Sequence, residues 1–436
     1  GVIGGTAPGA GNLIAFNGTQ GVVIASTNTG WSILGNSIHS NIGLGISLGG
    51  RPDLVDAPTP NDPCDADTGP NNLQNYPVIK SVTNTSGGVN ISGTLNSTAN
   101  TTFRLEFFGN DAIDPTGFGE GQVFLGFANV TTDGTCNASF NVNFPTTSKA
   151  LRVTATATDP LGSTSEFSTA IGQLLNISTR LRVQTGENVL IGGFIISGTD
   201  PKKVIVRGIG PSLAKFFPDF LADPTLELHD ASHTLATNDD WKVRPDGSSQ
   251  QAEIEATGLQ PTDDRESALI MTLPANNAGY TAIVQGKNGT TGIGVVEAYD
   301  LDVTTNSKLA NISTRGLVET GNNVLIGGFI SGNGLTTVIA VALGPSLKNF
   351  GITNPLLDPT LELHDSNGNT IRTNNDWKIR EDGNSQQAEI EATHLQPTDD
   401  RESALVQTLA PGGYTAIVSG VNNTTGIAVV EVFSLN

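Results

Sequence analysis

The chain has 436 residues and a formal net charge of −20, from 22 Lys and Arg against 42 Asp and Glu. That balance excludes nucleic acid and anionic membranes as partners, because both bind basic faces. Gly contributes 52 residues and charged residues only 15%, a composition that favours a turn-rich all-β protein over a helical or disordered one.

No apolar stretch approaches the roughly 18 residues that a membrane-spanning helix needs, so we expect no membrane insertion. The sequence starts at Gly1, without an initiator Met or a signal peptide. We therefore expect either a processed product or a piece of a longer protein.

Residues 1–50 contain a short internal repeat. The segment NLIAFNGTQGVVI (12–24) matches NSIHSNIGLGISL (36–48) at an offset of 24 residues, with alternating apolar side chains interrupted by Asn and Gly. This pattern predicts two coils of a right-handed parallel β-helix, in which apolar side chains stack inside and Asn residues stack at the corners. The opening IGGTAPGAGN resembles the coil openings of secreted bacterial β-helix proteins.

Two coils are fewer than the three that a stacked repeat normally needs to bury its apolar column. We therefore expect upstream coils, a cap or another subunit to cover them. The predicted column ends in an incomplete edge through which subunits would assemble. Six aliphatic residues make up this predicted assembly edge: Ile14, Val22, Ile24, Ile38, Ile46 and Leu48.

Residues 51–75 are polar, aperiodic and rich in Pro and Asp, which predicts an ordered loop or linker. Calcium prefers carboxylate and carbonyl oxygens from such loops. The run NDPCDADTGPNN supplies four candidate calcium ligands, namely Asp62, Asp65, Asp67 and Asn71. The run resembles half of a calcium-binding loop, but it lacks the bidentate Glu expected at the loop end.

Residues 76–173 contain seven short alternating runs separated by turn residues, which predicts an immunoglobulin-like β-sandwich. The two cysteines of the chain are Cys64 in the acidic loop and Cys136 in a predicted turn of the sandwich. An even pair in a chain of secreted character favours one disulfide over two free thiols. It would close a loop of about 73 residues and contribute on the order of 4 kcal/mol in the chain-entropy model.

The rest of the chain is a second, longer repeat. The segment NISTRLRVQTGENVLIGGF (176–194) recurs as NISTRGLVETGNNVLIGGF (311–329), and both copies contain DPTLELHD and LQPTDDRESAL. Many short alternating runs in each copy predict two tandem β-sandwich modules at 174–302 and 309–436, joined by a linker at 303–308.

These tandem modules resemble C-terminal repeats of large secreted and surface proteins from environmental bacteria, which follow β-helix and Ig-like segments. The layout LELHD…TNDDW…LPANNAGYTAIV also resembles the jelly rolls of the pre-peptidase C-terminal type. The resemblance extends over all 436 residues as a mosaic. It implies a role in display, adhesion or assembly.

Acidic residues of the first repeat form a second set of candidate calcium ligands, namely Asp239, Asp240, Asp263 and Asp264. The alternative is that these residues cap turns and pair with Arg265. Trp241 and Trp377 follow the TNDD and TNND runs. They either stack on a sugar ring or, as we favour, cover one end of a sandwich core.

The sequence predicts no enzyme. The run GISLG (45–49) fits G-x-S-x-G, but Ser47 lies within a predicted strand rather than on a strand-to-helix turn. The five histidines lack metal-ligand spacing. Glycosylation sequons cluster in the predicted sandwich, and a glycosylating host would modify them first at Asn84, Asn90, Asn96 and Asn100.

Together these features predict a non-enzymatic extracellular structural protein, a modular β rod that self-assembles head-to-tail into a fibre through its incomplete β-helix edge. Its partners would be further copies of itself, and calcium its only expected cofactor. The alternative is an adhesin or carbohydrate-binding stalk of a larger secreted protein, with glycans as ligands.

Overall fold

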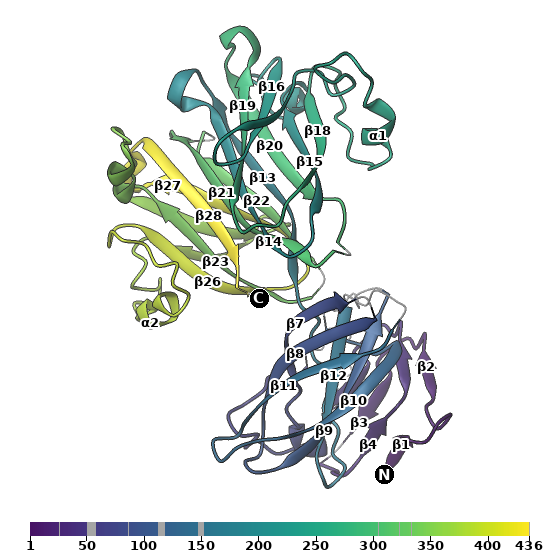
Figure 1. Ribbon diagram of the computed structural model, residues 1–436. Helices are drawn as coiled ribbons and strands as arrows, with labels where there is room; N and C mark the ends of the chain where they lie inside the picture. Colours follow the sequence, from purple (N-terminus) through teal and green to yellow (C-terminus); the bar gives the residue numbers. More distant parts are fainter. Residues whose placement is uncertain are drawn as a thin grey trace. The chain divides into compact units, whose positions relative to one another are not determined.

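The structure is a computed structural model that describes residues 1–25, 27–49, 58–85, 87–111, 118–146, 152–303, 305–321, 323–332 and 334–435. The described chain is all-β and divides into two compact units (Figure 1). The N-terminal unit is built mainly from Gly1–Gly172, and the C-terminal unit from Gln173–Gly332 and Thr336–Leu435. Among all the residues that the structure describes, no helix is long and apolar enough to cross a membrane.

The N-terminal unit begins with six three-residue strands, which pair in parallel as β1 with β4, β2 with β5 and β3 with β6. Ile14 pairs with Ile38 and Val22 with Ile46, at the offset of 24 residues seen in the sequence. We call the chain from β1 to β3 the first coil and that from β4 to β6 the second coil. The strands are β1 (Val2–Gly4), β2 (Leu13–Ala15), β3 (Val22–Ile24), β4 (Ser32–Leu34), β5 (Ser37–His39) and β6 (Ile46–Leu48).

Asparagine side chains link the two coils at their corners. The amide of Asn12 donates to Asn36 Oδ1 at 3.0 Å, and that of Asn17 donates to Asn41 Oδ1 at 2.7 Å. Between these corners the coils approach so closely that a Cβ on Gly21 would lie 2.6 Å from the carbonyl oxygen of the residue stacked on it. The repeat therefore has Asn where side chains must hydrogen-bond between the coils, and Gly where the coils are too close for a side chain.

The six residues of the predicted assembly edge lie inside the coils rather than at their surface. Five of them are buried, and Ile14 is partly buried against the same cluster, which also contains Phe108 and Phe167 of the following sandwich. The prediction that these six form an edge is therefore wrong. Alternation turns their side chains inward, and the edge consists of backbone groups and of the outward-facing residues between them.

A β-sandwich follows, with two three-stranded antiparallel sheets in the orders β10-β9-β12 and β11-β8-β7. Alternating side chains of both sheets form its core, including Ile91, Leu105, Phe107 and Val153. A short turn, η1 (Pro70–Leu73), precedes it, with left-handed backbone at Asn71, Asn72 and Leu73. The strands are β7 (Val78–Thr85), β8 (Gly88–Asn96), β9 (Thr102–Asn110), β10 (Val123–Thr131), β11 (Asn137–Phe144) and β12 (Arg152–Thr158).

The seventh predicted strand, TSEFSTA, is not a strand in the structure. Residues 163–168 instead run beside β12, where the amides of Ser165 and Ser168 donate to Ala157 and Ala155. The same segment turns side chains toward the second coil, where Thr164 and Glu166 accept hydrogen bonds from the amides of Ile33 and Leu48. The coils and the sandwich consequently form one compact unit, whereas the sequence predicts two modules at 1–50 and 76–173.

The C-terminal unit contains both copies of the long repeat, each with eight strands. The first copy comprises β13 (Gln173–Val183), β14 (Leu190–Gly198), β15 (Lys202–Ile209), β16 (Pro224–His229), β17 (Thr234–Asn238), β18 (Ser267–Leu273), β19 (Gly279–Gly286) and β20 (Gly292–Asp300), with the helical turns η2 (Gly186–Asn188), η3 (Pro211–Lys215), α1 (Gln251–Glu255) and η4 (Lys287–Gly289). The second comprises β21 (Ser307–Val318), β22 (Leu325–Gly332), β23 (Thr336–Leu343), β24 (Pro359–Asp365), β25 (Thr370–Asn374), β26 (Ser403–Leu409), β27 (Gly412–Gly420) and β28 (Gly426–Ser434), with η5 (Pro345–Phe350), α2 (Gln387–Glu391) and η6 (Val421–Asn423).

The two copies are interlocked rather than strung in tandem. Strand β13 pairs with β20 of its own copy and β22 of the other, and β21 pairs with β28 of its own copy and β14 of the other. One hydrophobic cluster contains residues of both copies, among them Phe194 and Phe329. The predicted separate modules at 174–302 and 309–436 are therefore wrong. Of the predicted linker 303–308, residue 304 lies outside the described residues and Ser307 already belongs to β21.

Equivalent residues of the two copies meet, which defines an internal pseudo-two-fold axis. Leu174 pairs with Leu309, its counterpart at an offset of 135, and the hydroxyls of Thr179 and Thr314 share a hydrogen bond at the same offset. Contacts between equivalent residues are the mark of an isologous interface. The duplicated sequence thus folds as a covalently joined dimer of one repeat.

Candidate functional site

The first coil ends in an edge that no described strand covers. Strands β1, β2 and β3 each lie in a two-stranded sheet, and the only partner of each is a strand of the second coil. Large apolar side chains lie exposed along this coil, with Val2 67%, Leu13 70% and Phe16 79% exposed. We call this surface the outer coil edge, and it combines unpaired strand edges with exposed apolar groups.

Phe16 is the most conspicuous residue of the outer coil edge. Its backbone is left-handed, with φ of 60°, at a corner where the second coil places Ser40 with φ of 57°. A small polar residue suits such a corner, whereas an exposed aromatic side chain in this conformation is uncommon. Its ring makes an edge contact with His39 at 5.8 Å between centroids and otherwise faces solvent.

The opposite edge of the coils is closed by the sandwich. The carboxylates of Glu106, Glu120 and Glu166 accept hydrogen bonds from the backbone amides of Gly35, Asn41 and Leu48, at 2.8, 3.1 and 2.8 Å. All three glutamates are buried, and each meets the second coil at or near the end of a different strand. Ile38 and Gly121 add a reciprocal backbone bridge. These acceptors take the place that the strands of a third coil would occupy.

Sequence reasoning missed these three glutamates. A Glu within an alternating run reads as an outward-facing polar residue, as in RLEFFG around Glu106. The signal that could have exposed Glu106 is the strong apolar character on both sides of it, which predicts burial on both faces. Nothing local identifies its partner, because Gly35 lies 71 residues away in the chain.

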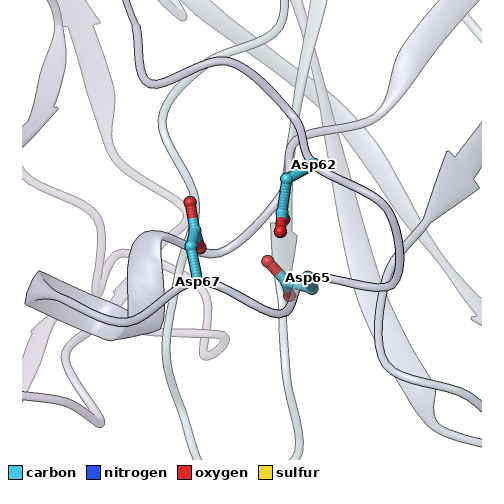
Figure 2. A group of neighbouring side chains, drawn as sticks. All are labelled: Asp62, Asp65 and Asp67. Atoms are coloured by element: carbon cyan, nitrogen blue, oxygen red, sulfur yellow. The ribbon is translucent and has the colours of Figure 1, made fainter.

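The acidic loop brings three of the four predicted calcium ligands together. Each of Asp62, Asp65 and Asp67 directs a carboxylate oxygen into one small space, where these oxygens lie within 4.8 Å of one another (Figure 2). Residues 51–57 of the predicted loop lie outside the described residues, and the cluster comes entirely from the described part.

The loop is held against the sandwich by covalent and polar links. Cys64 and Cys136 form the disulfide that the sequence favours. Asp65 accepts from the amide of Asn75 at 2.9 Å and from the hydroxyl of Ser97 at 2.6 Å. Cys64 and Asp65 adopt left-handed backbone, which turns the chain sharply enough for Asp62 and Asp67 to approach from either side.

Burial and neighbouring carboxylates destabilise the ionised forms of Asp65 and Asp67. Burial, and then the charges of Asp67 and Asp62, raise the pKa of Asp65 to about 6, against the hydrogen bonds that lower it. Burial and the charge of Asp62 also raise the pKa of Asp67. One oxygen of Asp62 and one of Asp67 are buried without a hydrogen-bond partner in the described structure. A hard cation with oxygen ligands would relieve both conditions.

Asn71, the fourth predicted ligand, does not belong to this cluster. It is fully buried, and its side chain accepts from the amide of Trp31 and donates to the carbonyls of Trp31 and Thr164. Its amide therefore joins the second coil to the segment beside β12. The prediction that Asn71 ligates calcium is wrong, because its hydrogen-bonding groups are already occupied.

The second predicted calcium set is divided in the structure. Asp239 and Asp240 do cluster, but with Asp223, and Lys287 Nζ lies 2.6 Å from Asp239 and already supplies a positive charge. Asp263 pairs with Arg265 at 2.9 Å and Asp264 with Lys242 at 2.6 Å, as in the alternative of paired carboxylates. In the second copy, Asn375 and Val421 stand in place of Asp239 and Lys287, so both charges disappear together.

Trp241 and Trp377 lie in the core, each 4% exposed, in small clusters beneath α1 and α2. Neither is available to stack on a sugar ring, which agrees with the favoured alternative. Ser47 is buried within β6, which confirms the prediction that it lies within a strand.

The four predicted glycosylation sites differ in access. The side-chain amide of Asn90 donates to Asn141, and that of Asn96 donates to Asn137 while its oxygen accepts from Cys64. Asn84 is half-buried in β7. Asn100 is exposed in a turn, which makes it the most accessible of the four.

Comparison with known proteins adds no family. No family model matches the chain, and no curated protein matches it. Among solved structures, it is similar to E. coli alpha-2-macroglobulin, with 9% identity and TM-score 0.20 over 81% of this chain, and it spans 22% of that chain's length. It is also similar to PNGF-II (9% identity, TM-score 0.15, 83% of this chain and 84% of that one) and to an alpha-L-rhamnosidase from Dictyoglumus thermophilum (8%, 0.17, 83% and 47%). Likeness at this level carries no argument about function.

Proposed function

We propose that this chain is a non-enzymatic extracellular structural protein that assembles with further copies of itself through the outer coil edge. In this proposal the coils are a short right-handed parallel β-helix, the sandwich is Ig-like, and the C-terminal unit is a pair of jelly-roll-like repeats. The observation that carries it is the unpaired edge of β1, β2 and β3 beside exposed Val2, Leu13 and Phe16. Edge strands of this kind pair readily with another chain.

Charge supports self-association at this surface. The chain carries a net charge of −20, yet residues 1–49 contain no Lys, Arg, Asp or Glu. Two copies that approach through other surfaces repel each other, whereas the coil edges meet without like-charge repulsion. The disulfide between Cys64 and Cys136 suits an oxidising, extracellular compartment.

The test is the size of the protein in solution with and without Phe16. The wild-type chain should sediment as an assembly, and Phe16→Asp should shift it to the monomer. Asp tolerates the left-handed corner, so the variant should fold. The matched control is Phe350→Asp in the C-terminal unit, since Phe350 is 81% exposed against 79% for Phe16. A wild-type chain that stays monomeric at high concentration would contradict the proposal.

We further propose that Asp62, Asp65 and Asp67 hold a calcium ion that fixes the acidic loop to the sandwich. Support comes from the convergence of the three carboxylates, the raised pKa values of Asp65 and Asp67, and the two buried oxygens without hydrogen-bond partners. The ion would have a structural role, since the loop is also tied by the disulfide.

Titration calorimetry with chelator-treated protein tests the calcium site. The wild type should bind one ion per chain, and Asp65→Asn should abolish that binding. Asp264→Asn is the control, because Asp264 is an exposed carboxylate paired with Lys242. Equal calcium binding by wild type and Asp65→Asn would reject the site.

A further inference from the structure

We infer that the outer coil edge takes the same edge of a second copy, so that the assembly is a closed, two-fold dimer and not the head-to-tail fibre expected from the sequence. This inference rests on the proposed function and names the partner surface. It follows from a difference between the two ends of the coils, since the sandwich covers one end and no described strand covers the other.

Head-to-tail stacking of coils needs two open edges, one at each end. The second coil offers none, because Glu106, Glu120 and Glu166 occupy its backbone amides and Gly121 bridges Ile38. A neighbouring copy would have to displace three buried carboxylates to stack there. The outer coil edge is therefore the one open coil edge in the described chain.

The arrangement of the three edge strands limits which surfaces can pair with the outer coil edge. Strands β1, β2 and β3 belong to three separate sheets, so their edges lie on different sides of the coil. A flat sheet edge, such as that of β10 in the sandwich, can pair with only one of them at a time. A partner that pairs with all three needs three short strands around a similar outline. The described chain has two such sets, and the one in the second coil is already capped.

Symmetry then fixes the contact. Two identical edges face each other when a two-fold axis runs perpendicular to the coil stack, and this rotation makes the facing strands antiparallel. Antiparallel pairing satisfies the backbone groups of both edges, and the exposed side chains of Val2, Leu13 and Phe16 become covered from both copies. Because the contact is isologous, it closes at two copies.

Complementary charge variants test this geometry. One variant carries Val2→Lys, Leu13→Lys and Val23→Lys, and the other carries Asp at the same three positions. These residues are exposed and come one from each edge strand. Each Lys-bearing strand therefore faces an Asp-bearing strand, whichever strand lies nearest the axis. Light scattering should give the dimer mass for wild type, the monomer mass for each variant alone, and the dimer mass for their equimolar mixture.

The outcomes separate the inference from the proposed function. Wild-type particles larger than a dimer, or a mixture of the two variants that stays monomeric, would overturn the isologous contact while leaving self-assembly standing. A wild-type chain that is monomeric at every concentration would overturn both. Circular dichroism of each variant, compared with wild type, verifies that loss of the dimer is not loss of the fold.

Discussion

At the scale of single residues, the C-terminal unit contains a buried ion pair in one copy and two neutral residues at the equivalent places of the other. Lys202 and Asp300 have fully buried side chains, with Nζ 2.8 Å from the carboxylate and 2.7 Å from the carbonyl of Asp302. Burial raises the pKa of Asp300, and the charge of Lys202 lowers it. In the second copy, Thr336 and Ser434 occupy the equivalent places.

We expect Lys202→Thr alone to destabilise the protein by about 3 to 5 kcal/mol, because it leaves Asp300 buried without its counter-charge. The double change Lys202→Thr with Asp300→Ser places the neutral residues of the second copy at both positions, leaves no buried charge unpaired, and should recover most of that loss. Denaturant unfolding of the two single variants and the double variant measures the coupling. Additive losses would show that the two side chains do not depend on each other.

The Asp65 carboxyl gives the protein a defined pH dependence. Its folded pKa of about 6 lies above the ordinary value of 3.8. The folded state therefore binds this proton more tightly, and the resulting stabilisation is complete below pH 3.8 and is lost as the pH rises through about 6. Calcium needs the ionised carboxylate, so stabilisation by the ion increases over the same interval.

Without calcium, the melting temperature of wild type should fall relative to that of Asp65→Asn as the pH rises from about 4 to about 7. Saturating calcium should raise the wild-type value at the upper end of this interval and leave the variant unchanged. Thermal scans across the interval, with chelator and with calcium, give both comparisons. Parallel profiles for the two proteins would mean that Asp65 does not titrate as described.

At the scale of elements, the coils depend on acceptors that the sandwich supplies. Glu166 accepts from the amide of Leu48 at 2.8 Å and from that of Thr59 at 2.6 Å. A buried amide left without an acceptor costs about 1 to 3 kcal/mol. The second coil is therefore held in place by side chains rather than by a third coil.

Glu166→Ala should destabilise the protein by about 2 to 5 kcal/mol, because two amides lose their acceptor. Glu187→Ala is the control, since the Glu187 side chain is 88% exposed and lies 3.8 Å from Arg315. Chemical unfolding compares the two variants. A loss for Glu166→Ala no larger than that of the control would mean that solvent replaces the carboxylate.

The elements of the coils were largely predictable from the sequence, and their contacts were not. Alternation together with Asn and Gly at fixed places gave the register of Ile14 with Ile38, because neighbouring coils repeat the same local pattern. The acidic cluster was predictable in part for the same local reason, since Asp62, Asp65 and Asp67 lie within six residues. The prediction for Asn71 was wrong because its hydrogen-bond partners, Trp31 and Thr164, are distant in sequence.

At the scale of the whole molecule, duplication has produced an internal symmetry that sequence cannot assign. Strands β14 and β22 have nearly the same sequence, so β13 can pair equally well with either by residue type. The structure pairs β13 with β22 and β14 with β21. The repeated motifs show that the two copies are equivalent, but they do not show which copy supplies the partner of each strand.

The boundaries of the two units follow from which segments share a hydrophobic core. Each prediction of separate modules assumed that a repeat or a run of strands buries its own core. The coils instead share a cluster with Phe108 and Phe167, and both long repeats contribute to one hydrophobic core. The described residues therefore form two compact units, and the first coil keeps strand edges that no described strand pairs.

Hydrogen exchange at two protein concentrations tests that open edge most directly. Alternate backbone amides of β1, β2 and β3 face away from the second coil, whereas that of Val22 already donates to the carbonyl of Gly45 at 2.9 Å. The outward-facing amides, those of residues 2, 4, 13, 15 and 23, should become more protected as concentration rises, because they pair only in the assembly. Amides of the second coil, already bonded to the glutamates of the sandwich, should be equally protected at both concentrations. Protection of the first coil that is complete in dilute solution and does not change with concentration would contradict the account.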